Sequence, residues 1–247
     1  MDKNMHIFYT PDIQKQESYT LPADESRHCI RVLRLKTDDE VQLIDGRGNL
    51  YSGVIYEPDP RGCKIAVNDM ISDYHKRNFH LHIAIAPTRN TDRFEWFLEK
   101  ATEIGIDEIT PLLCSRSERN TLKYERLNKV IVAAMKQSVI AKKPVLNEFA
   151  EIGAFLKKRL NGHILKFIAH CADGVRKNID HIYCPGRNVI CLIGPEGDFT
   201  AEEIELAIKN QFQPVTLGTN RLRTETAGVV ACEIFNFLNS TRRPESG

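Results

Sequence analysis

The pattern of apolar and polar positions changes near residue 72 of this 247-residue chain. Before that point, short apolar runs rich in β-branched and aromatic residues are separated by turn sequences, a pattern typical of an antiparallel sheet. These runs cover residues 6–9, 41–44, 50–56 and 63–67. The turn DGRGN at 45–49 has the glycines and aspartate of a hairpin. We therefore predict a small, partly closed β-barrel over residues 1–72, with a polar linker at 72–78.

Strands and amphipathic helices alternate in the second part of the chain, residues 73–247. Apolar strand-like runs cover 79–86, 108–114, 164–169, 188–193 and 214–217. Apolar residues at helical spacing fill 94–101, 127–135 and 224–238. Gly105 is expected to end the first of these helices, and Thr200 with Glu203 forms a capping box that opens a further one. This alternation predicts an α/β domain whose parallel sheet is covered by helices on both faces.

Composition places the chain among ordinary globular proteins, with 42% hydrophobic and 27% charged residues. We expect no membrane span, because no apolar run approaches the ~20 residues that one needs. The start, MDKNMHIFYTPD, lacks the apolar core of a secretory signal. The seven cysteines form no CxxC pair, so we expect buried, reduced thiols, no disulfide and no metal site. Both features favour a cytoplasmic protein.

The net charge of +1 hides an uneven distribution of charge. Between residues 115 and 143, eight basic residues stand against two acidic ones. Such a stretch is either a patch that neutralises nucleic-acid phosphates or the solvated face of a helix, and charge alone leaves both interpretations open.

Two loops follow predicted strands at the edge of the sheet where ligands of such folds bind. The first, IGPEGDFT at 193–200, has neither the lysine of a phosphate loop nor dinucleotide-binding glycine spacing. Its small residues allow main-chain groups to approach a flat, largely neutral ligand such as an adenosine. A tight strand-to-helix turn would explain the same glycines without any ligand.

The second loop, LGTNRLRTETA at 217–227, places two arginines beside the start of a predicted helix. Thr224, Thr226 and Glu225 are ordinary residues for a helix N-terminus. Arg221 and Arg223 are not, because positive charge is disfavoured there, so the arginines favour an anionic partner.

These two loops closely resemble the C-terminal motifs of the ribosomal RNA small subunit methyltransferase E family, in the SPOUT superfamily. Further segments match in the same order, and the resemblance covers nearly the whole chain. They are RHCIRVLRLKTDDEVQLIDGRG (27–48), EWFLEKATEIGIDEITPLLCSRS (95–117) and MKQS (135–138). The resemblance implies a PUA-like N-terminal domain and a SPOUT domain whose C-terminal loops form a trefoil knot. It implies SAM-dependent methylation of uridine N3 in 16S ribosomal RNA of the small ribosomal subunit, by a homodimer.

From the resemblance and the loops together we predict a cofactor site and a catalytic pair. Arg223 would stabilise a uridine oxygen or hold a phosphate, and Glu225 would act as base or orient the site, with Glu196 as the alternative carboxylate. The predicted cofactor contacts are Ile168, His170, Leu192, Gly194, Pro195, Glu196, Gly197, Leu217, Gly218, Leu222, Thr224 and Thr226.

Predicted RNA contacts come from arginines in both parts of the chain. Arg27, Arg31 and Arg34 are spaced by four and three residues, as on one face of a helical turn; the others are Arg47, Arg116 and Arg119.

Three positions depart from the family pattern: Asp198 where GPEGG is usual, Asn220 where an arginine is usual, and Ile140 near the place of another arginine. Two alternatives stay open, a related methyltransferase acting on another RNA such as tRNA, and a non-catalytic RNA-binding assembly protein. The latter would bind no SAM.

Overall fold

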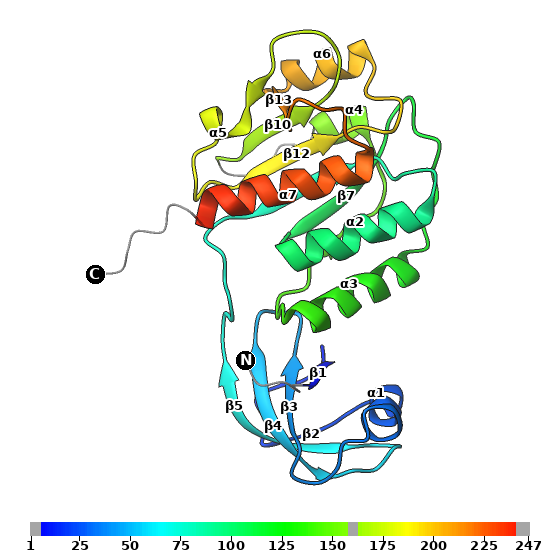
Figure 1. The fold of residues 1–247 in the computed structure, drawn as a ribbon, viewed down its shortest axis with the longest axis vertical. Helices are drawn as coiled ribbons and strands as arrows, with labels where there is room; N and C mark the ends of the chain where they lie inside the picture. Colours follow the sequence, from blue (N-terminus) through cyan, green and yellow to red (C-terminus); the bar gives the residue numbers. More distant parts are fainter. Residues whose placement is uncertain (1–5, 158–162, 241–247) are drawn as a thin grey trace, which may run out of the picture. The chain divides into compact units, whose positions relative to one another are not determined.

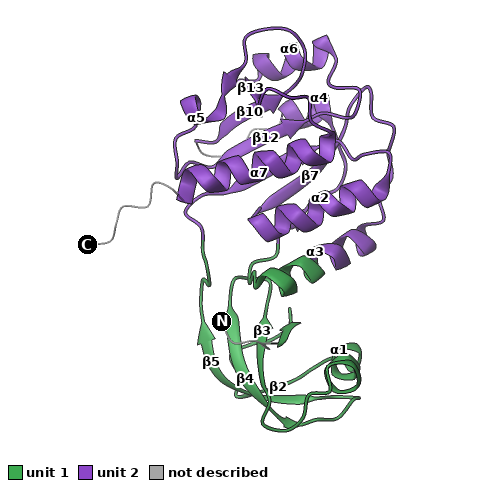
Figure 2. Ribbon diagram, viewed as in Figure 1, with its two compact units in different colours: residues 1–76, 132–143 green, residues 77–131, 144–247 purple. Residues whose placement is uncertain are grey.

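The computed structural model describes residues 6–157 and 163–240. It divides into two compact units (Figure 2). Unit 1 contains the residues up to Lys76 together with 132–143, and unit 2 contains 77–131 together with the residues from Pro144 onward. The return of residues 132–143 to unit 1 was not predicted from the sequence.

Unit 1 is built on a five-stranded sheet with the order β1-β3-β4-β5-β2. Its strands are β1 (His6–Tyr9), β2 (Ser18–Thr20), β3 (Glu40–Ile44), β4 (Leu50–Glu57) and β5 (Lys64–Ile71). The four predicted strands are confirmed, as is the hairpin at 45–49, which joins the antiparallel pair β3 and β4. Phe8, Leu43, Ile55 and Ile65 are fully buried in the core of this unit. The short β2, at the edge of the sheet, was missed.

Two short helical segments lie between β2 and β3: α1 (Ala23–Arg27) and the π-helical turn η1 (His28–Val32). Arg34 lies after the end of this segment with a φ of +58°. The predicted helical turn therefore carries Arg27 and Arg31, while Arg34 does not belong to it.

Unit 2 contains a parallel sheet with the order β11-β13-β10-β12-β6-β7-β8, and β9 pairs with β7 (Figure 1). Its strands are β6 (Leu81–Ile85), β7 (Glu108–Leu113), β8 (Val145–Leu146), β9 (Ala150–Glu151), β10 (Leu165–Ala169), β11 (Lys177–Asn178), β12 (Val189–Ile193) and β13 (Gln213–Thr216). The predicted strands and the parallel arrangement are confirmed; the three two-residue strands were not predicted. β6 and β12 are buried at every position, because helices cover both faces.

The helices are α2 (Thr91–Ile104), α3 (Tyr124–Ser138), α4 (Ile152–Lys157), α5 (Ile179–Ile182), α6 (Ala201–Lys209) and α7 (Thr224–Ser240). α2 and α7 pack together on one face of the sheet, and α4 and α6 contact one another on the other (Figure 1). Gly105 caps α2 with a φ of +114°, and Thr200 with Glu203 forms the predicted capping box of α6. α3 begins in unit 2 and ends in unit 1.

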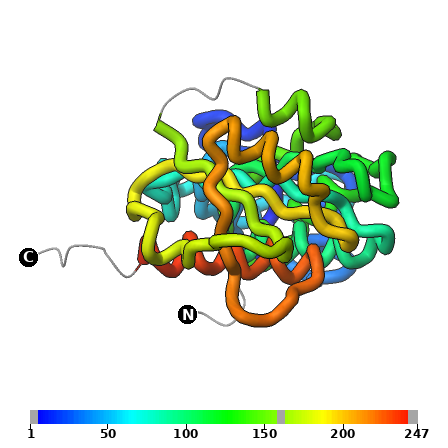
Figure 3. Tube along the Cα trace, turned by 90° about the horizontal axis from the view of Figure 1, so that it is seen from above, coloured from blue at the N-terminus to red at the C-terminus, as the bar shows by residue number. Residues whose placement is uncertain are grey.

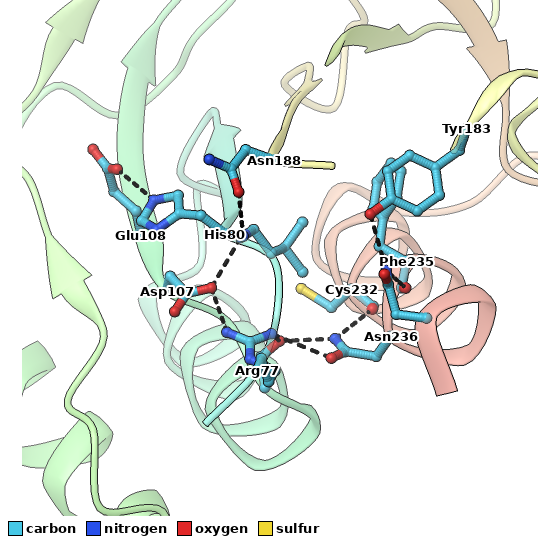
Figure 4. Close-up of polar contacts among 12 residues, drawn as sticks. Arg77, His80, Asp107, Glu108, Tyr183, Asn188, Cys232, Phe235 and Asn236 are labelled. Carbon is cyan, nitrogen blue, oxygen red and sulfur yellow. Dashed lines mark hydrogen bonds and ion pairs between the residues drawn. The ribbon is translucent and has the colours of Figure 1, made fainter. Parts of the chain in front are cut away.

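A polar cluster joins α2, β7 and α7 at the end of the sheet where β6 and β7 begin (Figure 4). The Arg77 guanidinium donates to the Gly105 carbonyl oxygen at 2.7 Å and to the Asn236 side-chain oxygen at 3.2 Å. It also pairs with the carboxylate of Asp107, which accepts from the Leu81 N–H as well. The cluster satisfies helix-terminal and strand-terminal groups that burial would otherwise leave unpaired.

The predicted burial of the cysteines holds for five of the seven. All seven thiols are free, and five are buried, but Cys171 and Cys184 are exposed. Within the described residues, no group of three or more His, Cys, Asp or Glu side chains could hold a metal ion. None of the helices in the described ranges is long and apolar enough to cross a membrane.

Candidate functional site

A cavity of about 300 Å³ lies in unit 2 at the carboxyl ends of β10, β12 and β13. Both predicted loops line it, and so does the segment after β10. Figure 3 shows the loop between β13 and α7, in orange, projecting from the rest of the unit. The volume of the cavity is at the lower end of the range for small-molecule sites, and the cavity lies where parallel sheets bind ligands.

The first loop is held tightly where the sequence has glycine. A Cβ on Gly194 would lie 3.1 Å from the Phe199 ring, and a Cβ on Gly197 would lie 3.2 Å from Cδ of Arg116. The main-chain oxygens of both glycines accept hydrogen bonds, from the Thr224 hydroxyl at 3.0 Å and from the Arg116 guanidinium at 2.7 Å. The loop is therefore fixed in place by groups from two other segments.

Asp198 occupies the position where the family pattern has glycine. Its φ of +63° lies in the left-handed region, which glycine adopts freely and aspartate better than most residues. Its two carboxylate oxygens accept from the Cys171 N–H at 2.7 Å and from the Phe199 N–H at 2.8 Å. The departure from the pattern thus preserves the backbone conformation and adds a link to the segment after β10.

His170 contributes a buried polar ring to the cavity. The residue is 8% exposed, and neither of its ring nitrogens has a hydrogen-bond partner. Burial lowers the pKa of the imidazole and Arg176 adds to this shift, whereas the Asp198 carboxylate and the main chain of Ala172 oppose it. Because unpaired buried polar atoms are costly, these nitrogens indicate a ligand with complementary polar groups.

The second loop supplies cationic side chains. Arg221 and Arg223 are exposed and line the cavity, together with Asn220. Gly218 has a φ of +132°, which explains the glycine at that position.

The predicted cofactor residues divide into two sets. Those that line the cavity are His170, Gly194, Pro195, Glu196, Leu217, Gly218, Leu222 and Thr224. Those that do not line it are Ile168, Leu192, Gly197 and Thr226. Ile168 and Leu192 are fully buried in the core between the sheet and the helices α4 and α6.

The two predicted catalytic residues also differ in placement. Arg223 lines the cavity, whereas Glu225 does not. The Glu225 side chain is 7% exposed, and its Oε1 lies 3.7 Å from Nε of Arg93 on α2. Its Oε2 is buried without a hydrogen-bond partner. Glu196, the alternative carboxylate, lines the cavity and accepts from the Arg89 N–H at 2.9 Å.

Three of the arginines predicted to contact RNA bind protein carbonyls. Arg116 donates to Gly197, Arg119 to the carbonyls of Thr88 and Arg89, and Arg47 to those of Pro11 and Ile13. Arg27 and Arg31 instead line a hollow of about 680 Å³ on unit 1, together with Arg61 and the acidic residues Glu57 and Asp59.

Three of the eight basic residues at 115–143 form ion pairs with carboxylates. Arg126 pairs with Glu95 at 2.6 Å, Lys129 with Glu125 at 2.7 Å, and Lys136 with Glu25 at 2.8 Å. For these three residues, the structure supports the solvated face of a helix, with the charges paired, over a phosphate-binding patch.

Sequence reasoning missed the cavity residues Cys171 and Arg176, which come from the segment between β10 and β11. The Arg176 guanidinium donates to the His170 carbonyl oxygen at 2.8 Å and so fixes this segment. In the sequence, only the position of this segment indicates that it belongs to the site: it follows a buried parallel strand, as the two predicted loops do.

Comparisons with known proteins agree with this arrangement. A family model described as an RNA methyltransferase domain matches residues 75–236, and one described as an RNA methyltransferase PUA domain matches residues 21–68. A crystal structure of a "probable rRNA-methyltransferase" from Porphyromonas gingivalis is 39% identical, with a TM-score of 0.90, and the match covers 97% of this chain and 100% of that one.

Two further relatives match over almost their full length. A Legionella pneumophila protein, described as a methyltransferase and solved with bound SAM, is 25% identical with a TM-score of 0.84, covering 95% of this chain and 98% of that one. The ribosomal RNA small subunit methyltransferase E of Rickettsia conorii is 27% identical over 96% of this chain and 97% of its own. The chain belongs to the RNA methyltransferase family and, within it, to the ribosomal RNA small subunit methyltransferases E.

Proposed function

We propose that this protein transfers a methyl group from SAM to N3 of a uridine in 16S ribosomal RNA of the small ribosomal subunit. The observation that carries the proposal is the cavity at the ends of three parallel strands, lined by two glycine-containing loops, a buried histidine and two exposed arginines. The relative with bound SAM supports the cofactor, and the relatives named for small-subunit ribosomal RNA support the substrate.

The residues present suit SAM. Main-chain groups of the two loops would surround its adenosine and methionine parts, and the unpaired nitrogens of His170 would meet polar groups of the ligand. When bound, SAM supplies an electrophilic methyl group, so the protein has mainly to position the uridine and to accept the proton that leaves N3. Correct positioning of two reactants can contribute roughly 7–11 kcal/mol.

Arg223 is proposed to stabilise the negative charge that develops on a uridine oxygen when the N3 proton leaves. Its exposed side chain at the cavity allows it to reach a bound base. For Glu225 we retain only the orienting role, because the side chain is buried beside Arg93 and does not line the cavity. Glu196, which does line the cavity, is the better placed candidate for the base.

The remaining family features are proposed on the same basis. They are a SPOUT domain with a trefoil knot at the C-terminal loops, a PUA-like domain before it, and a homodimer working in the cytoplasm, where ribosomal subunits are. The order β13-β10-β12 places the two cavity loops, which follow β12 and β13, on either side of β10 at one edge of the sheet. The exposed Trp96 and Phe237, on the neighbouring helices α2 and α7, provide apolar surface for a second copy.

We propose phosphate contacts for Arg27 and Arg31, which line the hollow on unit 1. For Arg34 the contact with RNA stays a prediction. Arg47, Arg116 and Arg119 are proposed to act mainly by holding the loops whose carbonyls they bind.

The proposal is tested by methyl transfer from labelled SAM to small ribosomal subunits from cells that lack the protein, with tRNA and large subunits as competing substrates. We expect label in the small subunit RNA only. Label in tRNA instead would establish the alternative substrate, and an absence of SAM binding would establish a non-catalytic RNA-binding protein.

A further inference from the structure

We propose that Asp198 is a positioning residue that fastens the segment after β10 to the loop after β12, and thereby fixes one wall of the cofactor cavity. The inference rests on the proposed function, because it concerns the same cavity. It concerns a feature of this chain, an aspartate where the family pattern has glycine.

The contacts of Asp198 reach two separate cavity segments. Its Oδ2 accepts from the main-chain N–H of Cys171, 27 residues away in sequence, at 2.7 Å. Its Oδ1 accepts from the N–H of Phe199, the following residue, at 2.8 Å. Hydrogen bonds to an ionised carboxylate are stronger than neutral ones, so this link holds the two segments at a defined separation.

The fastened segment carries the ring that lacks a partner. His170 precedes Cys171 directly, and its imidazole lines the cavity with both nitrogens buried and unpaired. The Arg176 guanidinium donates to the His170 carbonyl oxygen at 2.8 Å, in the same peptide unit whose N–H is bound by Asp198. With this peptide unit held on one side of its Cα and strand β10 ending at Ala169 on the other, the His170 main chain has a set position before any ligand arrives, which reduces the entropic cost of binding.

The backbone of Asp198 makes the inference testable without disturbing the loop. Because its φ of +63° suits glycine even better, Asp198→Gly removes the carboxylate while keeping the loop conformation. Asp198→Asn keeps an acceptor oxygen and tolerates the same φ. Asp38→Gly is the matched control, since Asp38 is exposed on unit 1 with a φ of +74°.

The experiment measures SAM affinity by calorimetry on the full chain, and steady-state KM and kcat. We expect Asp198→Gly to bind SAM about tenfold more weakly, with KM for SAM raised and kcat little changed, because the charge-assisted hydrogen bond that links the two segments is lost outside the reacting atoms. Asp198→Asn should recover part of this loss, and Asp38→Gly should equal the wild type.

A second measurement needs no cofactor. In the protein without SAM, NMR should show faster hydrogen exchange at the Cys171 amide in Asp198→Gly, and a further lowering of the His170 pKa, since the carboxylate that favours the charged ring is gone. Wild-type SAM affinity and unchanged Cys171 exchange in Asp198→Gly would overturn the inference. If the wild type binds no SAM but the exchange difference is present, the proposed function fails while the fastening role stands.

Discussion

Replacement of Arg77 by methionine tests whether the polar cluster at the beginning of β6 and β7 stabilises unit 2. Arg77 donates to Gly105 and Asn236 and pairs with Asp107 (Figure 4). Its guanidinium carbon lies 5.0 Å from the centre of the Phe79 ring. Methionine retains much of the aliphatic volume but none of the donors. The variant therefore removes the charge and the hydrogen bonds with little change in packing.

The size of the effect follows from burial. The Asp107 side chain is 7% exposed and that of Arg77 is 23% exposed, so the variant leaves a nearly buried carboxylate without its arginine. Removing one partner of a buried pair costs about 3–5 kcal/mol, and the residual exposure of Arg77 places the expected loss near the lower end, about 3 kcal/mol. For a chain of this size that loss lowers the unfolding midpoint by roughly 6–12 °C.

Calorimetry or circular dichroism during heating measures this midpoint. Arg61→Met, at an exposed arginine of unit 1, is the matched control and should shift it by little. Arg77→Met combined with Asp107→Asn should lose less than Arg77→Met alone, because the uncompensated charge is then absent. A midpoint for Arg77→Met within about 2 °C of the wild type would show that the cluster does not stabilise unit 2.

Three further predictions concern packing, pH and turnover. Gly228→Ala should lower the free energy of unfolding by about 1 kcal/mol, because its Cβ would lie 2.6 Å from the Phe97 ring and overpacking outweighs the gain in helix propensity; a raised unfolding midpoint would contradict this. The hydrogen bond from His80 lowers the pKa of Glu108 to about 2. The ionised Glu108 carboxylate therefore contributes about 1–2 kcal/mol, after solvent screening, to the free energy of unfolding. This contribution is present above the pKa of Glu108 in the unfolded chain, near 4.5, and is lost as the pH falls toward 2. Denaturant unfolding at several pH values checks this, since Glu108→Gln should lose less stability over that interval than the wild type. Arg223→Ala should reduce kcat for methyl transfer about 100-fold with little change in SAM affinity, and full turnover with normal SAM binding would exclude its proposed role.

Elements fixed by neighbouring residues were predictable from the sequence. The hairpin at 45–49, the stop of α2 at Gly105 and the capping box of α6 depend on local backbone chemistry, and each is present as expected. The return of residues 132–143 to unit 1 depends on contacts between distant segments. The apolar stripe of α3 continues across the unit boundary, so periodicity gives no sign of it.

At the site, the two loops could be predicted because parallel strands bring their carboxyl ends together. The directions of the side chains could not be predicted from the sequence. Glu225 directly follows a cavity residue, yet its carboxylate points to Arg93 on α2. The charges of Arg126 and Lys136 left a phosphate-binding patch and a solvated helix face equally open, and in the structure Glu95 and Glu25, 31 and 111 residues away in sequence, neutralise them. Such pairs form only when the chain is folded, so local charge counts overestimate a basic surface.

The most direct test of the central proposal identifies the methylated nucleoside itself. Small ribosomal subunits from cells that lack the protein are incubated with the purified protein and labelled SAM, and the digested RNA is separated by chromatography with mass detection. We expect label in 3-methyluridine, and none with subunits from cells that contain the protein, whose site is already methylated. Label in any other nucleoside, or no label from a protein shown to bind SAM, would contradict it.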